Sequence, residues 1–257
     1  MAKLYIGTSG FSYRHWKNGV FYPEGLPRTK QLEYYSKKFN TVELNSPFYH
    51  LPAEKTFLNW KNKVPENFVF AVKVSRFITH IKKLQDVEDV WQTFLKRAIF
   101  LENKLGPFLF QFPPSFIANE ENTKRLERFL EYLSVNSYNI HKNSRIRFAF
   151  EFRHSSWFSE NIYRIFKKHQ NATIALIDSP KFVFKEKTIG EFVYIRMHGS
   201  KALYSSNYSD RELKIWASRI KKYLKQSLDI YIYFNNDAMG YAVKNAKKLL
   251  ELIYQNR

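Results

Sequence analysis

The chain has 257 residues, of which 44% are hydrophobic and 18% aromatic, so it can bury a substantial core and is not dominated by disorder. It contains no cysteine, which excludes disulfides, thiolate metal ligands and a cysteine nucleophile. Lysine and arginine outnumber aspartate and glutamate by 42 to 23, and the resulting net charge of +19 favours polyanionic partners or, alternatively, a lysine-rich solvated surface.

The first ten residues, MAKLYIGTSG, lead directly into strand-like sequence and lack the apolar segment of a secretory signal. No stretch approaches the ~18 consecutive apolar residues expected of a membrane-spanning helix. The lack of cysteine also fits a reducing compartment. We therefore expect a cytoplasmic protein with no membrane partner.

Short strand-like runs alternate with longer helix-like stretches along the chain. The runs rich in β-branched and aromatic residues predict eight strands, at 4–10, 41–45, 68–75, 107–113, 147–153, 173–179, 192–198 and 229–236. Apolar residues recur at helical spacing in the stretches 27–39, 53–64, 87–105, 121–133, 159–170, 210–226 and 238–255. The connection 180–191 lacks this spacing, so we expect an irregular sixth unit.

Local signals support these element boundaries. Ser209 stands three residues before Glu212, a capping-box pattern that predicts the start of a helix. Pro65 and the pair at 106–107 are expected to end the second and third helices. Alternating strands and helices predict a parallel sheet, and eight such units favour a single (β/α)8 TIM-type barrel domain over residues 1–257. An open doubly wound sheet is the alternative, but GTSG is not its glycine fingerprint.

In a barrel, alternate strand residues face the helices and the interior. If the bulky apolar residues face the helices, polar residues near the carboxyl ends of the strands face inward, where barrel enzymes hold their active sites. This inward set is Ser9, Glu43, Asn45, Lys73, Ser75, Gln111, Glu151, Arg153, Arg196, His198, Tyr233 and Asn235. In the sixth strand, Asp178 and Ser179 remain alternatives. The pair Glu151 and Arg153 fits a catalytic role and a structural ion pair equally well.

The inward charges suggest an anionic ligand. Three cations (Lys73, Arg153 and Arg196) outnumber two carboxylates, which suits a small phosphate-bearing or otherwise anionic molecule. Proton transfer would fall to the predicted catalytic residues Glu43, Glu151 and His198. Residues 235–237 (Asn-Asn-Asp) are expected to open the last helix, whose amides could help to hold a phosphate unless Asp237 itself occupies the cap.

Cofactor signals are weak throughout the sequence. A metal site built from Glu43, Glu151, Asp178 and His198 is an alternative, but the cations between them would compete with the ion. No metal or nucleotide motif identifies a cofactor. Aromatic residues of the loops are expected to line a pocket, stack on bases or sugars, or cover the top of the barrel: Tyr13, Trp16, Phe48, Tyr49, Trp157, Tyr204 and Tyr208.

Eight segments occur in an order typical of one protein family: GTSGFSYRHW, FYP, TVELNSPFY, FVFAVKVSRFITH, LGPFLFQFPPSF, FEFRHSSW, YIRMHGS and YFNND. From about residue 4 to about residue 250 the chain resembles the YecE-like family, domain of unknown function 72. The resemblance implies a TIM-type barrel. It also implies a set of recurring polar residues: Glu43, Asn45, Tyr49, Lys73, Thr79, His80, Gln111, Glu151, Arg153, Trp157, Arg196, His198, Asn235 and Asn236.

Family membership implies no established reaction. The family barrel is similar to those of endonuclease IV and xylose isomerase relatives, which suggests nuclease or sugar-related activity. The metal-binding histidines and carboxylates of those enzymes have no counterpart set in this sequence, so fold analogy alone supports that suggestion.

We therefore expect a hydrolase-like or lyase-like enzyme that uses glutamate and histidine acid–base chemistry on a small anionic ligand. Its predicted ligand-binding residues are Asn45, Tyr49, Lys73, Gln111, Arg153, Trp157, Arg196, Asn235 and Asn236. The first alternative is a nucleic-acid-binding or nuclease-like protein that uses the basic surface and the loop aromatics. The second is a non-catalytic scaffold.

Overall fold

The computed structural model describes residues 2–136, 138–139 and 144–255. Its longer strands form two parallel sheets. One sheet has the order β2 (Thr41–Leu44), β3 (Val69–Lys73), β4 (Leu105–Gln111), β7 (Phe148–Glu151) and β8 (Ala172–Ile174). The other has the order β1 (Leu4–Thr8), β11 (Asp229–Phe234), β10 (Phe192–Met197) and β9 (Leu176–Asp178). A short antiparallel hairpin joins β5 (Tyr138–Asn139) to β6 (Ser144–Arg145).

The two sheets approach each other at two places. Ser9, just after β1, forms an isolated parallel bridge with Glu43 of β2, and the Gly10 N–H donates to the Glu43 carbonyl at 2.8 Å. At the other place, Ala175 alone separates β8 from β9, and its N–H donates to the carbonyl of Phe150 at 2.9 Å. The predicted sixth strand therefore runs from one sheet into the other. The structure confirms an α/β fold with parallel strands, arranged as two sheets.

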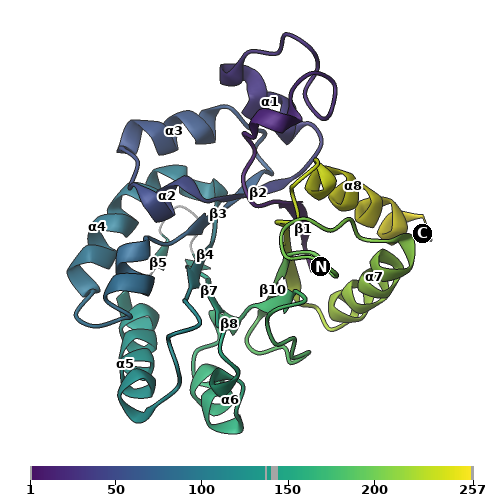
Figure 1. Ribbon diagram of the computed structural model, residues 1–257. Coiled ribbons are helices and arrows are strands. Elements are labelled where there is room, and N and C mark those ends of the chain that lie inside the picture. Colours follow the sequence, from purple (N-terminus) through teal and green to yellow (C-terminus); the bar gives the residue numbers. More distant parts are fainter. Residues whose placement is uncertain (1, 137, 140–143, 256–257) are drawn as a thin grey trace.

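Helices lie around the outside of the strands (Figure 1). They are α1 (Gln31–Ser36), α2 (Ser46–Tyr49), α3 (Glu54–Asn62), α4 (Glu88–Ala98), α5 (Glu120–Asn136), α6 (Glu160–Lys167), α7 (Asp210–Lys225) and α8 (Tyr241–Tyr254). Short 3-10 helices cover Arg14–Trp16, Arg28–Lys30, Ile99–Lys104 and Ser155–Trp157, and a π-helical turn covers Phe77–Ile81. None of the helices within the described residues is long and apolar enough to cross a membrane.

The helix boundaries follow the sequence signals closely. The capping box is present at the start of α7, where the Ser209 hydroxyl accepts from the Glu212 N–H and the Glu212 carboxylate accepts from the Ser209 N–H. Residues 180–191 contain no helix, as expected of the irregular sixth unit. One expectation is wrong: α8 begins only at Tyr241, after Gly240 in the left-handed region (φ 68°), so residues 235–237 precede the last helix and do not open it.

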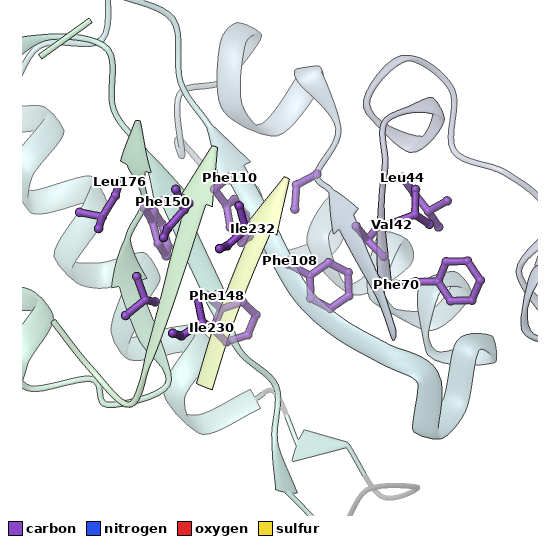
Figure 2. Close-up of a cluster of buried hydrophobic side chains, with 14 of the residues drawn as sticks. Val42, Leu44, Phe70, Phe108, Phe110, Phe148, Phe150, Leu176, Ile230 and Ile232 are labelled. Carbon is purple, nitrogen blue, oxygen red and sulfur yellow. The ribbon is translucent and has the colours of Figure 1, made fainter. Parts of the chain in front are cut away.

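Two separate apolar clusters lie on the two sides of the strands. The larger one packs between strands and helices. Among the members drawn in Figure 2, those labelled are Val42, Leu44, Phe70, Phe108, Phe110, Phe148, Phe150, Leu176, Ile230 and Ile232. Phe150, for example, stacks on Phe110 at 5.0 Å and meets the edge of Phe166 from α6 at 5.3 Å. The smaller cluster contains Val69, Ala71, Leu109, Ala149, Ala175, Phe192, Tyr194, Tyr231 and Tyr233. The phenylalanines of β7 thus face the helices and Ala149 faces the opposite side, as the alternation in the sequence predicts.

Candidate functional site

A buried ion network joins three strands at their carboxyl ends. Arg196 of β10 donates from Nη1 to Oε2 of Glu151 at 2.6 Å and from Nη2 to Oε1 of Glu43 at 2.8 Å. Both carboxylates are 0% exposed and the Arg196 side chain is 2% exposed. We call the group formed by this network and its neighbours the carboxyl-end site; its residues are Glu43, Lys73, Glu151, Arg153, Arg196 and His198.

Each carboxylate of the network has several donors. Glu43 accepts from the Ser9 hydroxyl at 2.7 Å and from the Tyr194 hydroxyl at 2.7 Å, in addition to Arg196. Glu151 accepts from Nε of Arg153 at 2.9 Å on the oxygen that Arg196 does not contact. Buried carboxylates with this many donors are held in one position. The network therefore gives the site a rigid set of charged side chains.

Glu151 is held in its ionised form. Burial raises the pKa of its carboxyl, but the charges of Arg196 and Arg153 outweigh burial and hold the pKa well below its ordinary value of 4.5. Burial alone would lower the pKa of Arg196, and the two carboxylates instead raise it. At neutral pH Glu151 can accept a proton but has none to donate.

His198 lies beside Glu151 beneath two aromatic rings. Its Nε2 is 3.6 Å from Oε2 of Glu151, which is too long for a hydrogen bond, and its Nδ1 is 3.1 Å from Nδ2 of Asn235. The imidazole is 0% exposed, and burial lowers its pKa below the ordinary value of 6.5. The ring is therefore neutral at pH 7. Tyr204 meets the ring edge-on at 5.1 Å and Phe182 lies 6.4 Å away, so these rings separate His198 from solvent.

Arg153 is the more accessible guanidinium of the site. Its side chain is 16% exposed, against 2% for Arg196. Besides Glu151, it contacts the Tyr204 hydroxyl through Nη2 at 3.1 Å, and its guanidinium lies 4.6 Å from the centre of the Phe182 ring. An anion that enters this site would therefore meet Arg153 before Arg196.

Lys73, at the end of β3, is a cation without a carboxylate partner. Its side chain is half-buried, and none of the carboxylate oxygens in the described part of the chain lies within 4 Å of its Nζ. Instead, Nζ lies 3.9 Å from the centre of the Phe48 ring. Burial, together with the charge of Arg196, lowers the pKa of this amine to about 7.

His80 lies next to the carboxyl-end site, beside Phe48. Its ring meets Phe48 edge-on at 5.1 Å, and its Nδ1 is 2.9 Å from the Thr79 hydroxyl oxygen. Burial lowers its pKa to about 4, with further contributions from Lys73 and Arg153. Reasoning from the strand pattern did not find His80, because it lies in a π-helical turn after β3; only the family resemblance included it.

A family model described as "Protein of unknown function DUF72" matches residues 5–257. The chain belongs to the DUF72 family. Among its curated relatives, UPF0759 protein YunF of Bacillus subtilis is 27% identical over 280 residues, covering 97% of this chain and 94% of the relative. UPF0759 protein YecE of Escherichia coli is 27% identical over 158 residues, covering 61% of this chain and 51% of the relative.

Solved structures show the same relationship. A crystal structure of a DUF72 family protein from Thermotoga maritima is 30% identical and has a TM-score of 0.83, with coverage of 98% of this chain and 99% of that chain. A D-tagatose 3-epimerase-like protein has a TM-score of 0.54 over 99% of both chains at 15% identity. That second likeness concerns the fold alone.

Several residues predicted for the site lie away from the carboxyl-end site. Trp157 is 0% exposed on the helix side of β7, where it stacks on Phe152 at 4.4 Å. Asn236 is also buried, and its Nδ2 donates to the Ser206 carbonyl at 2.9 Å and to Oδ1 of Asn245 at 2.8 Å. These contacts hold a loop against α8. Neither side chain reaches the carboxyl-end site.

Asp178 likewise points away from the carboxyl-end site. Its carboxylate accepts a hydrogen bond from Nε1 of Trp216 on α7, at 2.5 Å, so it faces the helices. Asp237 accepts from Nε1 of Trp16 and contacts Nε2 of His15, both at 2.9 Å. Within the described residues, no group of three histidine, aspartate or glutamate side chains is arranged to hold a metal ion.

The remaining predicted residues lie at the rim or support it. Gln111 is 3% exposed and donates to the Phe112 carbonyl at 2.7 Å, and Asn45 is half-buried at the end of β2. Tyr49 is 63% exposed on α2 beside Phe48. The loop aromatics differ in exposure: Tyr13, Tyr49 and Tyr204 stay accessible, and Trp16, Phe48, Trp157 and Tyr208 are buried.

A cavity of about 990 Å³ opens at the opposite, amino-terminal ends of the strands. Its floor contains Tyr5 and Tyr231, stacked at 4.8 Å, and its wall contains the ion pair between Arg147 and Asp229 at 2.6 Å. Arg147 also donates to the Tyr231 hydroxyl at 2.9 Å. The lining as a whole holds three cations and three carboxylates, Lys3, Arg145, Arg147, Glu66, Glu191 and Asp229, so its charges balance.

Proposed function

We propose that the chain is an enzyme with a single (β/α)8-type barrel domain that binds a small anionic ligand at the carboxyl-end site. The bridge between Ser9 and Glu43 and the strand shared through Ala175 support one ring formed by the two sheets. The shared position of charged residues at the carboxyl ends of β2, β3, β7 and β10 supports an active site there, because barrel enzymes place their catalytic groups at this end.

The charge balance of the site supports an anionic ligand. Arg196 and Arg153 together balance Glu43 and Glu151, and each of these four side chains has an oppositely charged partner within 4 Å. Lys73 adds an amine that this balance does not neutralise. This surplus amine, whose protonated form a bound anion would favour, is the observation on which the proposal rests. Arg153 and Lys73 are thus the expected anion-binding residues, and Arg196 orients the two glutamates.

Proton transfer would use Glu151 and His198. Glu151 is an ionised carboxylate and can serve as a base. If the Asn235 amide donates to Nδ1 of His198, the imidazole proton is on Nε2, on the side that faces Glu151. A ligand that displaces Tyr204 from Arg153 would also reach His198, because Tyr204 contacts both of these side chains.

A thermal-shift experiment tests anion binding. Glycerol 3-phosphate and inorganic phosphate are compared with neutral glycerol at constant ionic strength, using the wild type, Arg153→Gln and Lys73→Met. Lys96→Met is the control, since Lys96 is exposed on α4. We expect saturating phosphate compounds to raise Tm by about 3 °C or more in the wild type and the control, and by much less in the two site variants. No shift with any phosphate or carboxylate compound would contradict the proposal.

A second candidate function is binding of a nucleic acid, and one groove favours it. A hollow of about 670 Å³ beside α7 and α8 is lined by Lys214, Lys221, Lys222 and Lys225, and its lining contains no acidic residue. Phosphate backbones bind such lysine clusters with strong salt dependence. Fluorescence anisotropy with single-stranded and duplex DNA tests it. Affinity should fall steeply with salt and further in Lys222→Glu/Lys225→Glu; unchanged affinity in that variant would exclude the groove.

A further inference from the structure

Lys73 differs from both arginines of the carboxyl-end site in what surrounds its charged end. Arg153 and Arg196 each contact a carboxylate, whereas Nζ of Lys73 faces the ring of Phe48 at 3.9 Å. Burial and the charges of Arg196 and Arg153 oppose protonation of this amine, and they outweigh the more distant carboxylates Glu151 and Glu43, which favour it. A half-buried amine with cationic neighbours and no carboxylate partner is the environment in which enzymes keep a lysine neutral and nucleophilic.

We propose that Lys73 acts as a nucleophile and forms an imine with a carbonyl group of the ligand. This inference rests on the proposed function, because it assigns to the anionic ligand an aldehyde or ketone. The amine nitrogen attacks the carbonyl carbon, a C–N bond forms, and the carbonyl oxygen takes up a proton to give a carbinolamine. The nitrogen then loses a proton, the hydroxyl takes one and leaves as water, and a C=N bond remains. The step consumes no oxidant or reductant.

The neutral form of the amine is available where it is needed. An ordinary lysine with a pKa of 10.5 has roughly one neutral amine in 3,000 at pH 7. Because burial and the neighbouring arginines lower the pKa of Lys73 to about 7, about half of its amines are neutral at that pH. The residue as a whole keeps partial exposure to solvent.

Phe48 would stabilise the product of this step. A protonated imine carries its positive charge at the nitrogen, the same position that the ammonium occupies in the free protein. The face of the Phe48 ring is the negative end of its quadrupole and attracts a cation at this distance. The reactive form of Lys73 is thus the neutral amine, and the iminium formed from it gains a favourable contact.

Reductive trapping tests the proposal. The protein is incubated at pH 7 with a small excess of glyoxylate, an anionic aldehyde, or of glycolaldehyde, a neutral one, and sodium borohydride is added. Hydride transfer to the imine carbon fixes the adduct as a secondary amine, which peptide mass spectrometry locates. We expect the adduct on Lys73 to exceed that on exposed Lys96 at least tenfold with glyoxylate. Lys73→Arg should lose this adduct while the remaining lysines keep theirs.

The outcomes separate the imine from the anion site. If the adduct is spread over the lysines according to their exposure, and Lys96 is labelled as much as Lys73, Lys73 is not a selective nucleophile and the proposal is refuted. If glyoxylate raises Tm but gives no Lys73 adduct, anion binding stands and the imine is refuted. If both aldehydes label Lys73 selectively and equally, and no anion raises Tm, the nucleophile stands and the proposed anion site fails. Lys73→Arg should retain the Tm response to phosphate, because it keeps the positive charge.

Discussion

Arg196 and Glu43 connect the two sheets at the carboxyl ends of their strands, with Nη2 of Arg196 2.8 Å from Oε1 of Glu43 and almost no solvent contact for either side chain. Arg196 belongs to β10 of the four-stranded sheet and Glu43 to β2 of the five-stranded sheet. A buried ion pair can contribute little net stability and still be costly to break, because loss of one partner leaves the other as an unpaired buried charge. The pair therefore favours the arrangement of strands that keeps both partners together. The network is therefore part of the fold as well as of the candidate site.

Glu151→Gln should lower the free energy of unfolding by about 3–5 kcal/mol, because it leaves Arg196 and Arg153 without their shared carboxylate in a buried position. Urea denaturation followed by circular dichroism measures this loss. Glu24→Gln, on an exposed loop, is the control and should have little effect. If Glu151→Gln is as stable as the wild type, the ion network is not required for the fold and its residues are freer for catalysis.

Acid should reduce the stability difference between the wild type and Glu151→Gln. The pKa of Glu151 in the folded state lies well below 4.5, its ordinary value. Above pH 4.5 the unfolded carboxyl is also ionised, so the full stabilising contribution of Glu151 is present there. As pH falls below 4.5 the unfolded state takes up a proton first, and the contribution declines. Denaturation curves at pH 7, 5 and 3.5 check this; a constant difference would contradict the assigned direction.

Lys73→Met should make the protein more stable at neutral pH, by about 1–2 kcal/mol once partial exposure is allowed for. The pKa of Lys73 is lowered from 10.5 to about 7, so between these values the unfolded chain binds the proton and the folded chain does not. Stability of the wild type therefore rises with pH across this range, and the advantage of the variant is largest below pH 7. Denaturation at pH 6, 7.5 and 9 measures the trend, with Lys96→Met as the control that shows none.

Gly7→Ala should destabilise the protein by about 3 kcal/mol through steric overlap. A Cβ at this position would overlap the carbonyl oxygen of Thr41 and lie 2.9 Å from the Tyr35 hydroxyl. Both contacts belong to the place where β1 approaches β2. Gly19→Ala is a comparison without steric overlap, because an added Cβ there meets no atom within 4 Å; its φ of 86° alone should cost about 1 kcal/mol, less than the overlap at Gly7. Thermal unfolding distinguishes the two; equal Tm values would show that β1 and β2 can separate without cost.

The strand pattern predicted the α/β class and the side that each β7 residue faces, because alternation is a local property. Phe148 and Phe150 face the helices and Ala149 and Glu151 face the other side, as their spacing requires. The same rule, applied strictly, would have placed Asp178 correctly: it continues the alternate series of Ile174 and Leu176, which pack with the helices. Strand alternation alone therefore predicts that Asp178 faces the helices and Ser179 the opposite side.

Other parts of the site could not be read from one sequence. Trp157 follows β7 in a 3-10 helix, whose turn returns the indole to the helix side, so strand parity no longer applies to it. The pairing of Arg196 with Glu43 depends on the position of two strands separated by 153 residues, and neither strand carries that information alone. Lys73 was predicted as a ligand-binding cation, but its lack of a carboxylate partner emerges only from three-dimensional placement.

The strand order has a consequence for synthesis of the chain. β1 is made first, yet its ladder partner is β11, at Asp229–Phe234, so the first strand stays without that partner until almost the whole chain has left the ribosome. Until then β1 has contacts on its other edge alone, where the Asn40 side chain accepts from the Ile6 N–H and donates to the Leu4 carbonyl and where Ser9 bridges to β2. Its exposed backbone groups are open to mispairing during this interval. Nascent chains that stop before residue 229 would thus be the vulnerable species, and chaperone dependence should end abruptly when β11 emerges.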